Sequence, residues 1–285
     1  MILSEFAPAK INLFLSVIEK RPDNYHNIGT MFHTISIGDT LWGEADNSGE
    51  ISLTYSNPQD YPVEKDLVVK VAHKLKEKYD LGNSNKSHLG VKFYLEKKLP
   101  LGAGLGGGSA DAAAALRMLN KLWDLNLSFA ELENIGAKLG ADIPFLVRGG
   151  AAFAEGIGDI LTPQKNIDSK HCIILVATPK CAVPTADAYR GIVPSGKESW
   201  ENFKQNDCGG SNITTLLYNQ FEESILPSYP LINSLKNKLN ELGGHSLMSG
   251  SGASVFSIFD SMSRTVKARE SLAADCRFIE IAKFM

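Results

Sequence analysis

The sequence lacks the features that mark secreted proteins, membrane-spanning proteins and proteins stabilised by a structural metal ion. Its four cysteines, Cys172, Cys181, Cys208 and Cys276, are scattered along 285 residues without a CxxC pair, so neither a zinc site nor a disulfide framework is indicated. No apolar run is long enough to cross a bilayer, and the first residues have neither the basic start nor the apolar core of a signal peptide. We therefore expect a reduced, cytoplasmic protein without a membrane partner.

Strong charge is also missing. The formal net charge of −3 gives no electrostatic reason to expect nucleic acid or an anionic membrane as a partner. With 44% hydrophobic and 21% charged residues, the composition is typical of a soluble globular protein. A chain of 285 residues can bury a large core, and its length favours two domains over one.

Glycine is concentrated in one stretch, where five glycines between Gly102 and Gly108 lead through Ser109 into an alanine-rich segment. Glycine allows positive φ and a close approach of the backbone to an anion. Ser109 is a good N-cap for the helix that the alanines predict, and a helix N-terminus presents unpaired N–H groups. The stretch therefore predicts a phosphate site, with a tight strand-to-helix turn as the simpler alternative.

Two common phosphate motifs fail in this stretch. Gly102, Gly104 and Gly107 match the dinucleotide fingerprint, but a second strand with a ribose-binding acid should follow the helix, and the residues after Asp124 read as another helix. The spacing also resembles a P-loop, yet Gly108 stands where the phosphate-binding lysine belongs. Neither a dinucleotide site nor a P-loop is predicted.

Hydrophobic periodicity gives a mixed α and β chain. In the first half we expect strands at 1–17 (with a break at 7–10), 35–42, 51–55 and 89–95, a helix at 66–79 capped by Asp66, and after the glycines two helices, the second from the Ser128 capping box to Gly140. In the second half we expect a strand at 172–177, helices near 185–190, 213–225 and 231–242, a hairpin at 246–259, a helix near 262–274 and a strand near 278–283. This last order is that of a split βαβ, ferredoxin-like layer.

A few polar and aromatic residues are candidates for a site. Lys10 and Asn12 share one face of the first strand, although a solvated strand end is the simpler interpretation of Lys10. Tyr25 and His26 lie in a predicted loop and could stack on a ring. Asp142 precedes Ile-Pro and, taken alone, is most simply the N-cap of a short helix.

Three segments carry a resemblance to a known family. Pro8-Ala-Lys-Ile-Asn-Leu13, the stretch Pro100 to Ser109, and Ser249-Gly-Ser-Gly-Ala-Ser254 resemble, in order and spacing, the three motifs of the GHMP small-molecule kinases. Further segments narrow the resemblance to the branch that acts on a cytidine diphosphate sugar alcohol: Lys10-Ile-Asn12, Asn24-Tyr-His26, the Gly104-Leu-Gly-Gly-Gly108 form of the loop, Gly140-Ala-Asp-Ile-Pro144, Ala152-Phe-Ala-Glu-Gly156 and Val183-Pro-Thr185. The resemblance covers essentially the whole chain.

That resemblance implies an α+β protein with the GHMP kinase fold. We expect a ribosomal-protein-S5-like N-terminal, ATP-binding domain at residues 1–160 and a ferredoxin-like C-terminal domain at residues 161–285. The implied partners are a small-molecule substrate and ATP with Mg²⁺, and the chain would act as a monomer or homodimer.

The resemblance also implies roles for individual residues. Asp142 takes the proton from the acceptor hydroxyl, and Lys10 holds Asp142 ionised and stabilises the developing alkoxide. The residues expected to bind the nucleotide are Pro100, Leu101, Gly102, Ala103, Gly104, Leu105, Gly106, Gly107, Gly108, Ser109, Asp66 and Lys97. The residues expected to bind the substrate are Asn12, Tyr25, His26, Asp142, Thr185 and Tyr189, with Tyr25, His26 and Tyr189 bracketing the cytosine.

The chain departs from the family pattern at three of these places. Ala110 replaces a frequent second serine, Tyr189 replaces a frequent phenylalanine, and Asp66 replaces a frequent asparagine. A carboxylate accepts hydrogen bonds but cannot donate them, so Asp66 cannot make every contact of an asparagine. Lys97 and Lys98 are alternatives for a nucleotide contact, and no carboxylate stands out as a Mg²⁺ ligand.

Three other functions compete with this reading. One is a GHMP kinase for mevalonate-like, homoserine-like or sugar substrates. Tyr25, His26 and Tyr189 argue against it, because a small aliphatic substrate has no ring on which these side chains could stack. Another is a non-catalytic ligand sensor on the same fold, and the presence of both Lys10 and Asp142 argues against it. A dinucleotide oxidoreductase is disfavoured by the missing ribose-binding acid.

Overall fold

The computed structural model describes residues 2–46, 48–80, 89–167, 172–206 and 213–285. The chain forms two compact units whose segments alternate along the sequence. Unit 1 consists of Met1–Ala9, Gly38–Leu99 and Gly107–Arg148, and unit 2 of Lys10–Ile37, Pro100–Gly106 and Gly149–Met285. Two long strands, β1 (Ile2–Lys20) and β2 (His26–Asp46), contribute residues to both units. The predicted boundary between residues 160 and 161 stays a prediction.

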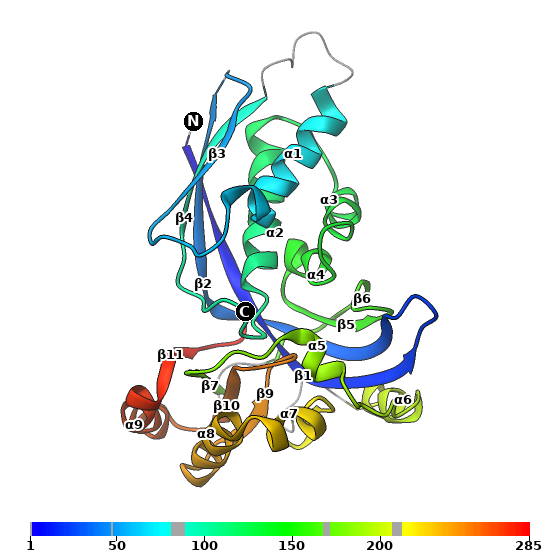
Figure 1. The fold of residues 1–285 in the computed structure, drawn as a ribbon, viewed down its shortest axis with the longest axis vertical. Coiled ribbons are helices and arrows are strands. Elements are labelled where there is room, and N and C mark those ends of the chain that lie inside the picture. The colour runs from blue at the N-terminus through cyan, green and yellow to red at the C-terminus, as the bar shows by residue number, and fades with distance from the viewer. Residues whose placement is uncertain (1, 47, 81–88, 168–171, 207–212) are drawn as a thin grey trace. The chain divides into compact units, whose positions relative to one another are not determined.

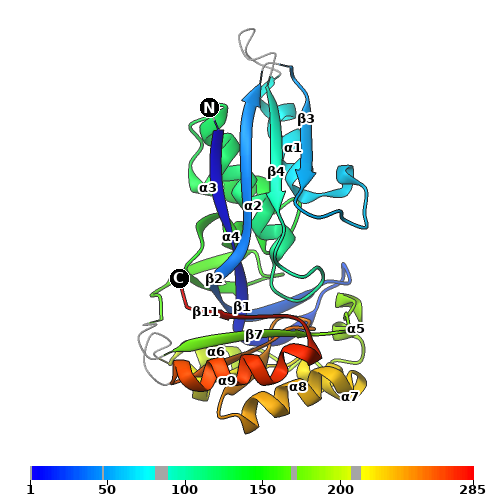
Figure 2. The same ribbon diagram turned by 90° about the vertical axis from the view of Figure 1, so that its left-hand side faces the viewer.

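Unit 1 is a sheet with helices on one face (Figure 2). Strand β4 (Gly90–Glu96) lies between β2, with which it pairs antiparallel, and β3 (Ile51–Tyr55), with which it pairs parallel. The helices are α1 (Leu67–Asp80), α2 (Gly107–Leu122), α3 (Phe129–Gly136) and α4 (Ile143–Arg148), with the 3-10 turn Val63–Lys65 before α1. The alanines at 112–115 are fully buried, and such small side chains let α2 approach its neighbours α1 and α4 closely (Figure 1).

The helix boundaries of unit 1 test three of the predicted caps. Asp66 caps α1, because its Oδ1 accepts the N–H of Val68 at 2.8 Å. Ser128 and Glu131 form the predicted capping box of α3, although α3 ends at Gly136 and the chain continues to Gly140 as a turn. The prediction for Ser109 is wrong, because α2 already begins at Gly107 and Ser109 therefore lies inside its first turn.

Unit 2 contains the ferredoxin-like layer that the sequence predicts. Its four-stranded antiparallel sheet has the order β11-β7-β10-β9, and α8 and α9 lie along one face of it (Figure 2). The elements are β7 (Ile173–Pro179), α8 (Pro230–Glu241), β9 (His245–Met248), β10 (Val255–Phe259), α9 (Met262–Leu272), the 3-10 turn Ala273–Asp275 and β11 (Cys276–Ala282).

The remaining elements of unit 2 surround the parts of β1 and β2 that belong to it. These are β5 (Ala151–Glu155), β6 (Ile160–Gln164), α5 (Thr185–Tyr189), α6 (Glu198–Lys204), the 3-10 turn Ile213–Leu216, β8 (Tyr218–Asn219) and α7 (Glu222–Ser228). Phe14 of β1 stacks on Phe203 of α6 with a centroid distance of 4.2 Å, and Trp200 is fully buried beside them. Aromatic packing thus joins β1 to a helix far along the chain.

The strand predicted at 35–42 is part of the much longer β2, which begins at His26, a residue predicted to lie in a loop. Two further predicted elements differ from the structure. Strand β1 runs without a break through Pro8, because β8 pairs with β1 only at Phe14 and Leu15, and an edge strand tolerates the missing N–H of proline. The predicted helix at 213–225 is replaced by a 3-10 turn, β8 and α7, since Asn219 is drawn to the carbonyls of Met248 and Gly250 by side-chain hydrogen bonds.

The remaining composition-based expectations concern cysteines and membranes. Cys181 and Cys276 are free thiols, and Cys208 lies outside the described residues. Within the described ranges, no helix is both long enough and apolar enough to cross a membrane.

Candidate active site

The three segments that carry the family resemblance meet in unit 2. The backbone N–H of Lys10 donates to the carbonyl of Leu105 at 2.9 Å, and that of Ser254 donates to the carbonyl of Ala103 at 3.1 Å. The hydroxyl of Ser249 donates to the carbonyl of Gly104 at 2.9 Å. The carbonyls of the glycine-rich loop, residues 100–106, are therefore held by the first and third motifs.

Backbone conformation explains the glycines of this loop. Gly102, Gly104 and Gly106 have φ angles of +59°, +75° and +69°, which glycine adopts without strain. Gly104 is also sterically required, since a Cβ there would lie 2.0 Å from the carbonyl oxygen of Ser249. The third motif thus packs directly against the backbone of the loop.

The side chain of Lys10 is buried, and neighbours within unit 2 hold it by a hydrogen bond and an aromatic contact. Its side chain is 4% exposed, its Nζ donates to Asn12 Oδ1 at 2.8 Å, and the ammonium lies 5.1 Å from the centre of the Phe32 ring. Asn12 in turn donates to the hydroxyl of Thr30 at 2.8 Å. The solvated-strand-end interpretation of Lys10 is therefore wrong, and Thr30 is a polar residue of the site that sequence reasoning missed.

Aromatic rings gather near the start of β2. The rings of His26 and Tyr189 stack with a centroid distance of 4.7 Å and an interplanar angle of 19°, and the edge of Tyr189 packs on Phe221. Burial, and to a smaller extent the charge of Lys20, lowers the pKa of His26, so this ring is neutral at neutral pH. Tyr25 beside it is 61% exposed.

Thr185 connects this aromatic group to the third motif. It is the first residue of α5, the helix that also carries Tyr189. Its hydroxyl lies 3.3 Å from the hydroxyl of Ser251. Of the residues predicted to bind the substrate, unit 2 therefore contains Asn12, Tyr25, His26, Thr185 and Tyr189.

Asp142 belongs to unit 1, where it directly precedes α4. Its backbone carbonyl accepts the N–H of Leu146 at 3.1 Å, so its position fits the predicted start of a short helix. In the turn before it, a Cβ at Gly140 would lie 3.6 Å from the hydroxyl oxygen of Ser109. The first turn of α2 and the turn that carries Asp142 are thus neighbours, while the pairing of Asp142 with Lys10 stays a prediction.

Asp66 is held on both carboxylate oxygens. Oδ1 caps α1, and Oδ2 accepts hydrogen bonds from the hydroxyls of Tyr55 at 3.0 Å and Tyr61 at 2.8 Å. Burial, followed by the hydrogen bond to Asp66, raises the pKa of Tyr61 to about 12. Burial, followed by the charge of Asp66, also raises the pKa of Tyr55, so both tyrosines stay protonated donors. An aspartate suits this place because every neighbour that contacts the carboxylate is a donor.

Lys97 lies between two carboxylates in the interior of unit 1. Its ammonium forms ion pairs with Asp39 and Asp111, and the three side chains are 6%, 0% and 2% exposed. Lys98, in contrast, is more than half exposed and lies 3.3 Å from Glu96. Sequence reasoning missed both partners of Lys97, although a charge within a buried strand (Asp39) and one within an alanine run (Asp111) were visible signals.

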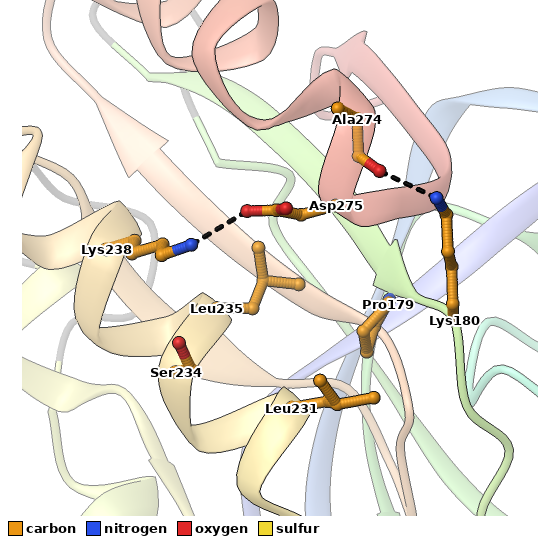
Figure 3. A pocket seen from close by; sticks show the side chains of 8 residues that line it. All are labelled: Pro179, Lys180, Leu231, Ser234, Leu235, Lys238, Ala274 and Asp275. Atoms are coloured by element: carbon orange, nitrogen blue, oxygen red, sulfur yellow. Dashed lines mark hydrogen bonds and ion pairs between the residues drawn. The ribbon is translucent and has the colours of Figure 1, made fainter.

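A cavity of about 330 Å³ in unit 2 lies away from these residues (Figure 3). It is lined by Pro179, Lys180, Leu231, Ser234, Leu235, Lys238, Ala274 and Asp275. Its charged groups already have partners: Lys238 pairs with Asp275 at 2.7 Å, and Lys180 donates to the carbonyl of Ala274 at 2.7 Å. No predicted site residue lines this cavity.

Comparison of the sequence with known proteins shows the family to which the chain belongs. Residues 66–150 match the family model "GHMP kinases N terminal domain", and residues 197–277 match "GHMP kinases C terminal". A protein of Exiguobacterium sibiricum named 4-diphosphocytidyl-2-C-methyl-D-erythritol kinase is 36% identical, with 98% of this chain and 96% of the relative covered. A protein of the same name from Parabacteroides distasonis is 38% identical, with 95% and 96% covered.

Solved structures agree with the sequence relatives. A crystal structure of 4-(cytidine 5'-diphospho)-2C-methyl-D-erythritol kinase matches with a TM-score of 0.80 and 30% identity, covering 99% of both chains. A homoserine kinase from Cytophaga hutchinsonii has the same fold, with a TM-score of 0.70 and 20% identity over 100% of this chain and 94% of the other. The chain therefore belongs to the GHMP kinase family and, within it, to the 4-diphosphocytidyl-2-C-methyl-D-erythritol kinases.

Proposed function

We propose that this protein transfers the γ-phosphoryl group of ATP to the 2-hydroxyl of 4-diphosphocytidyl-2-C-methyl-D-erythritol, giving the 2-phosphate and ADP in the non-mevalonate isoprenoid pathway. The observation that carries the proposal is the meeting of three motifs around the buried Lys10. Relatives that bear the kinase's name are similar over nearly the whole chain, and the solved structure with that name covers 99% of it.

The proposed phosphate site is the loop Pro100–Gly106 together with Gly107, Gly108 and Ser109 at the start of α2. Neighbouring groups hold the carbonyls of Ala103, Gly104 and Leu105, which favours N–H groups of the loop for an anion. The N-terminus of α2 adds a partial positive charge. These fixed donors suit the charge that spreads over the phosphoryl oxygens during transfer.

Lys10 and Asp142 are the proposed catalytic residues. A tertiary hydroxyl is a poor nucleophile at neutral pH, and a positioned base that accepts its proton accelerates transfer by about a hundredfold or more. We assign that proton acceptance to Asp142. The ammonium of Lys10, held by Asn12, would keep Asp142 ionised and stabilise the alkoxide that develops on the substrate.

The aromatic group of unit 2 is the proposed cytosine site. His26 and Tyr189 are in direct contact, so a base would stack on the outer face of the pair and not between the two rings, and we assign the other face of the base to the exposed Tyr25. Stacking on an aromatic side chain contributes about 1–3 kcal/mol per base in single-stranded nucleic-acid complexes. Asn12 and Thr185 would bind polar groups of the substrate.

Asp66 and Lys97 are the proposed contacts to the rest of the nucleotide. The ammonium of Lys97 lies beside the first residue of α2, since a Cβ at Gly107 would be 3.3 Å from its Nζ. Mg²⁺ is expected as part of MgATP, because this ion usually keeps several waters and binds through substrate phosphates with one or two carboxylates. Among the described residues, no group of three or more His, Cys, Asp or Glu side chains is placed to hold a metal ion. We further propose a cytoplasmic monomer or homodimer.

An ADP-release assay with several acceptors tests the proposed function. We expect turnover with 4-diphosphocytidyl-2-C-methyl-D-erythritol, and phosphorus NMR should then show a new phosphate monoester beside the intact diphosphate. Turnover with mevalonate or homoserine, together with none on the cytidine compound, would refute the proposed substrate. Tight NAD binding without competition by ATP would instead favour the oxidoreductase alternative.

A further inference from the structure

The two ends of the glycine-rich loop converge on one buried ion cluster in unit 1. Lys97 directly follows β4 and lies three residues before the loop, and Asp111 lies in the second turn of α2, which begins directly after the loop. The third member, Asp39 of β2, accepts the backbone N–H groups of Lys98 and Leu99 at 2.6 and 2.7 Å. We call Asp39, Lys97 and Asp111 the loop clamp.

We propose that the loop clamp is a positioning device for ATP, in which Asp39 and Asp111 act through Lys97 to fix the two points where the glycine-rich loop begins and ends. This inference rests on the proposed role of the loop in binding the phosphates. Neither carboxylate needs to touch the nucleotide.

The chemistry of the loop explains why a clamp is useful. Three of its seven residues have positive φ and are glycines, and glycine loses more conformational freedom on ordering than any other residue. Ordering a disordered loop on ligand binding therefore costs conformational entropy and weakens affinity. A loop whose ends are already fixed loses less entropy on binding. Asp39 fixes the backbone before the loop, and Lys97 ties that backbone to the helix after it.

Charge decides which substitutions the clamp should tolerate. The cluster holds two carboxylates and one ammonium, and the second oxygen of Asp111, Oδ1, is buried without a hydrogen-bond partner among the described residues. Burial, followed by the proximity of Asp39, raises the pKa of Asp111 well above its ordinary value despite Lys97. An asparagine at this position keeps an oxygen for the hydrogen bond from Lys97 and leaves the carboxylate of Asp39 to balance the ammonium.

The test compares Asp111→Ala, Asp111→Asn and Asp39→Asn by steady-state kinetics. We expect Asp111→Ala to raise the KM for ATP about tenfold, the typical effect of losing a hydrogen bond to a charged group. The kcat at saturating ATP and the KM for the cytidine substrate should change less than about twofold, because uniform binding energy is lost. Asp111→Asn should stay within about threefold of the wild type, while Asp39→Asn, which sets an amide N–H against the ammonium, should again raise the KM for ATP.

Glu5→Ala is the matched control. Glu5 also pairs with α2 in unit 1, through Arg117 and Lys121, but it lies outside the clamp. The Glu5→Ala substitution should lower the melting temperature without changing the KM for ATP. An equal rise in that KM for Glu5→Ala and Asp111→Ala would overturn the proposal, as would folded Asp111→Ala with an unchanged KM. If Asp111→Ala does not fold, Asp39→Asn decides by the same criterion.

One more variant separates this inference from the proposed function. Gly104→Ala distorts the loop itself, because Gly104 has positive φ and no room for a Cβ. A raised KM for ATP in Gly104→Ala with normal values in Asp111→Ala and Asp39→Asn would overturn the clamp and leave the loop as the phosphate site. An unchanged KM in Gly104→Ala would refute the loop as phosphate site, and the clamp with it.

Discussion

Around Lys10, individual side chains form a hydrogen-bonded chain in which each member fixes the next. Thr30 donates to the carbonyl of Phe14 at 2.6 Å and accepts from Asn12. With its amide nitrogen used in this way, Asn12 turns its oxygen toward Lys10. A satisfied buried network of this kind fixes geometry because leaving any member unpaired is costly.

Thr30→Val tests this chain. Valine has the same shape but neither accepts from Asn12 nor donates to Phe14, so the amide of Asn12 can rotate. We expect kcat to fall by about tenfold, the effect of one lost hydrogen bond transmitted to Lys10. Thr34→Val is the matched control, since Thr34 is also buried on β2 and bonds to Gly150 instead. Equal kcat values in the two variants would contradict the role of Thr30.

His33 is a second residue with a measurable role, in stability. Burial lowers its pKa from 6.5 to about 4, and its Nε2 accepts the N–H of Ile167 at 3.2 Å, so the native ring is neutral. The unfolded chain therefore binds this proton first as pH falls. The protonation of His33 therefore leaves the free energy of unfolding unchanged above pH 6.5. Between pH 6.5 and about 4 it lowers that free energy, by up to about 3 kcal/mol.

Urea unfolding between pH 7 and pH 4 measures that loss. The free energy of unfolding should decrease over this range in the wild type and decrease less steeply in His33→Gln, whatever the absolute stability of the variant. Parallel pH dependences in the two proteins would show that His33 is not the group responsible.

Among the elements, those with strong local signals were predictable from the sequence. The bounds predicted for β3 are those observed, because its strand-forming residues are bounded by turn residues. The capping box of α3 was found because Ser128 and Glu131 are three residues apart and act within one turn. The helix predicted at 213–225 was wrong because Asn219 is bonded to residues about thirty positions away, which no local pattern reveals.

The capping box gives a prediction for one element. Ser128→Ala removes the side-chain cap of α3 and should lower the free energy of unfolding by about 1 kcal/mol, with both KM values unchanged. Ser261 occupies the same position at the start of α9 but makes no side-chain cap bond. Ser261→Ala should therefore cost clearly less in thermal or urea unfolding, and a cost equal to that of Ser128→Ala would contradict the capping account.

For the whole molecule, the sequence predicted the fold class and the three motifs, because each motif is a short stretch with its own backbone chemistry. It did not predict the loop clamp, since Asp39 lies 58 residues from Lys97 and only the fold brings them together. Unit 2 takes Lys10–Ile37 from the first half of the chain, an arrangement that no local sequence pattern reveals. Phe14 packing on Trp200 and Phe203 is one reason for this arrangement.

A fragment of residues 161–285 tests this interleaving. Without β1, β2 and β5 it loses the strand partner of β8 and the aromatic partners of α6. We expect it to show no cooperative thermal transition by circular dichroism, in contrast to the full chain. A sharp transition in the fragment would instead support an independent domain that begins near residue 161.

In the proposed mechanism, Lys10 and Asp142 act on the hydroxyl while the glycine-rich loop holds the phosphates. The most direct measurement is kcat together with the dissociation constant for ATP in Asp142→Asn, with Lys10→Met alongside. We expect kcat to fall by about a hundredfold or more, with ATP affinity within about threefold of the wild type. A near-normal kcat in Asp142→Asn would contradict this mechanism.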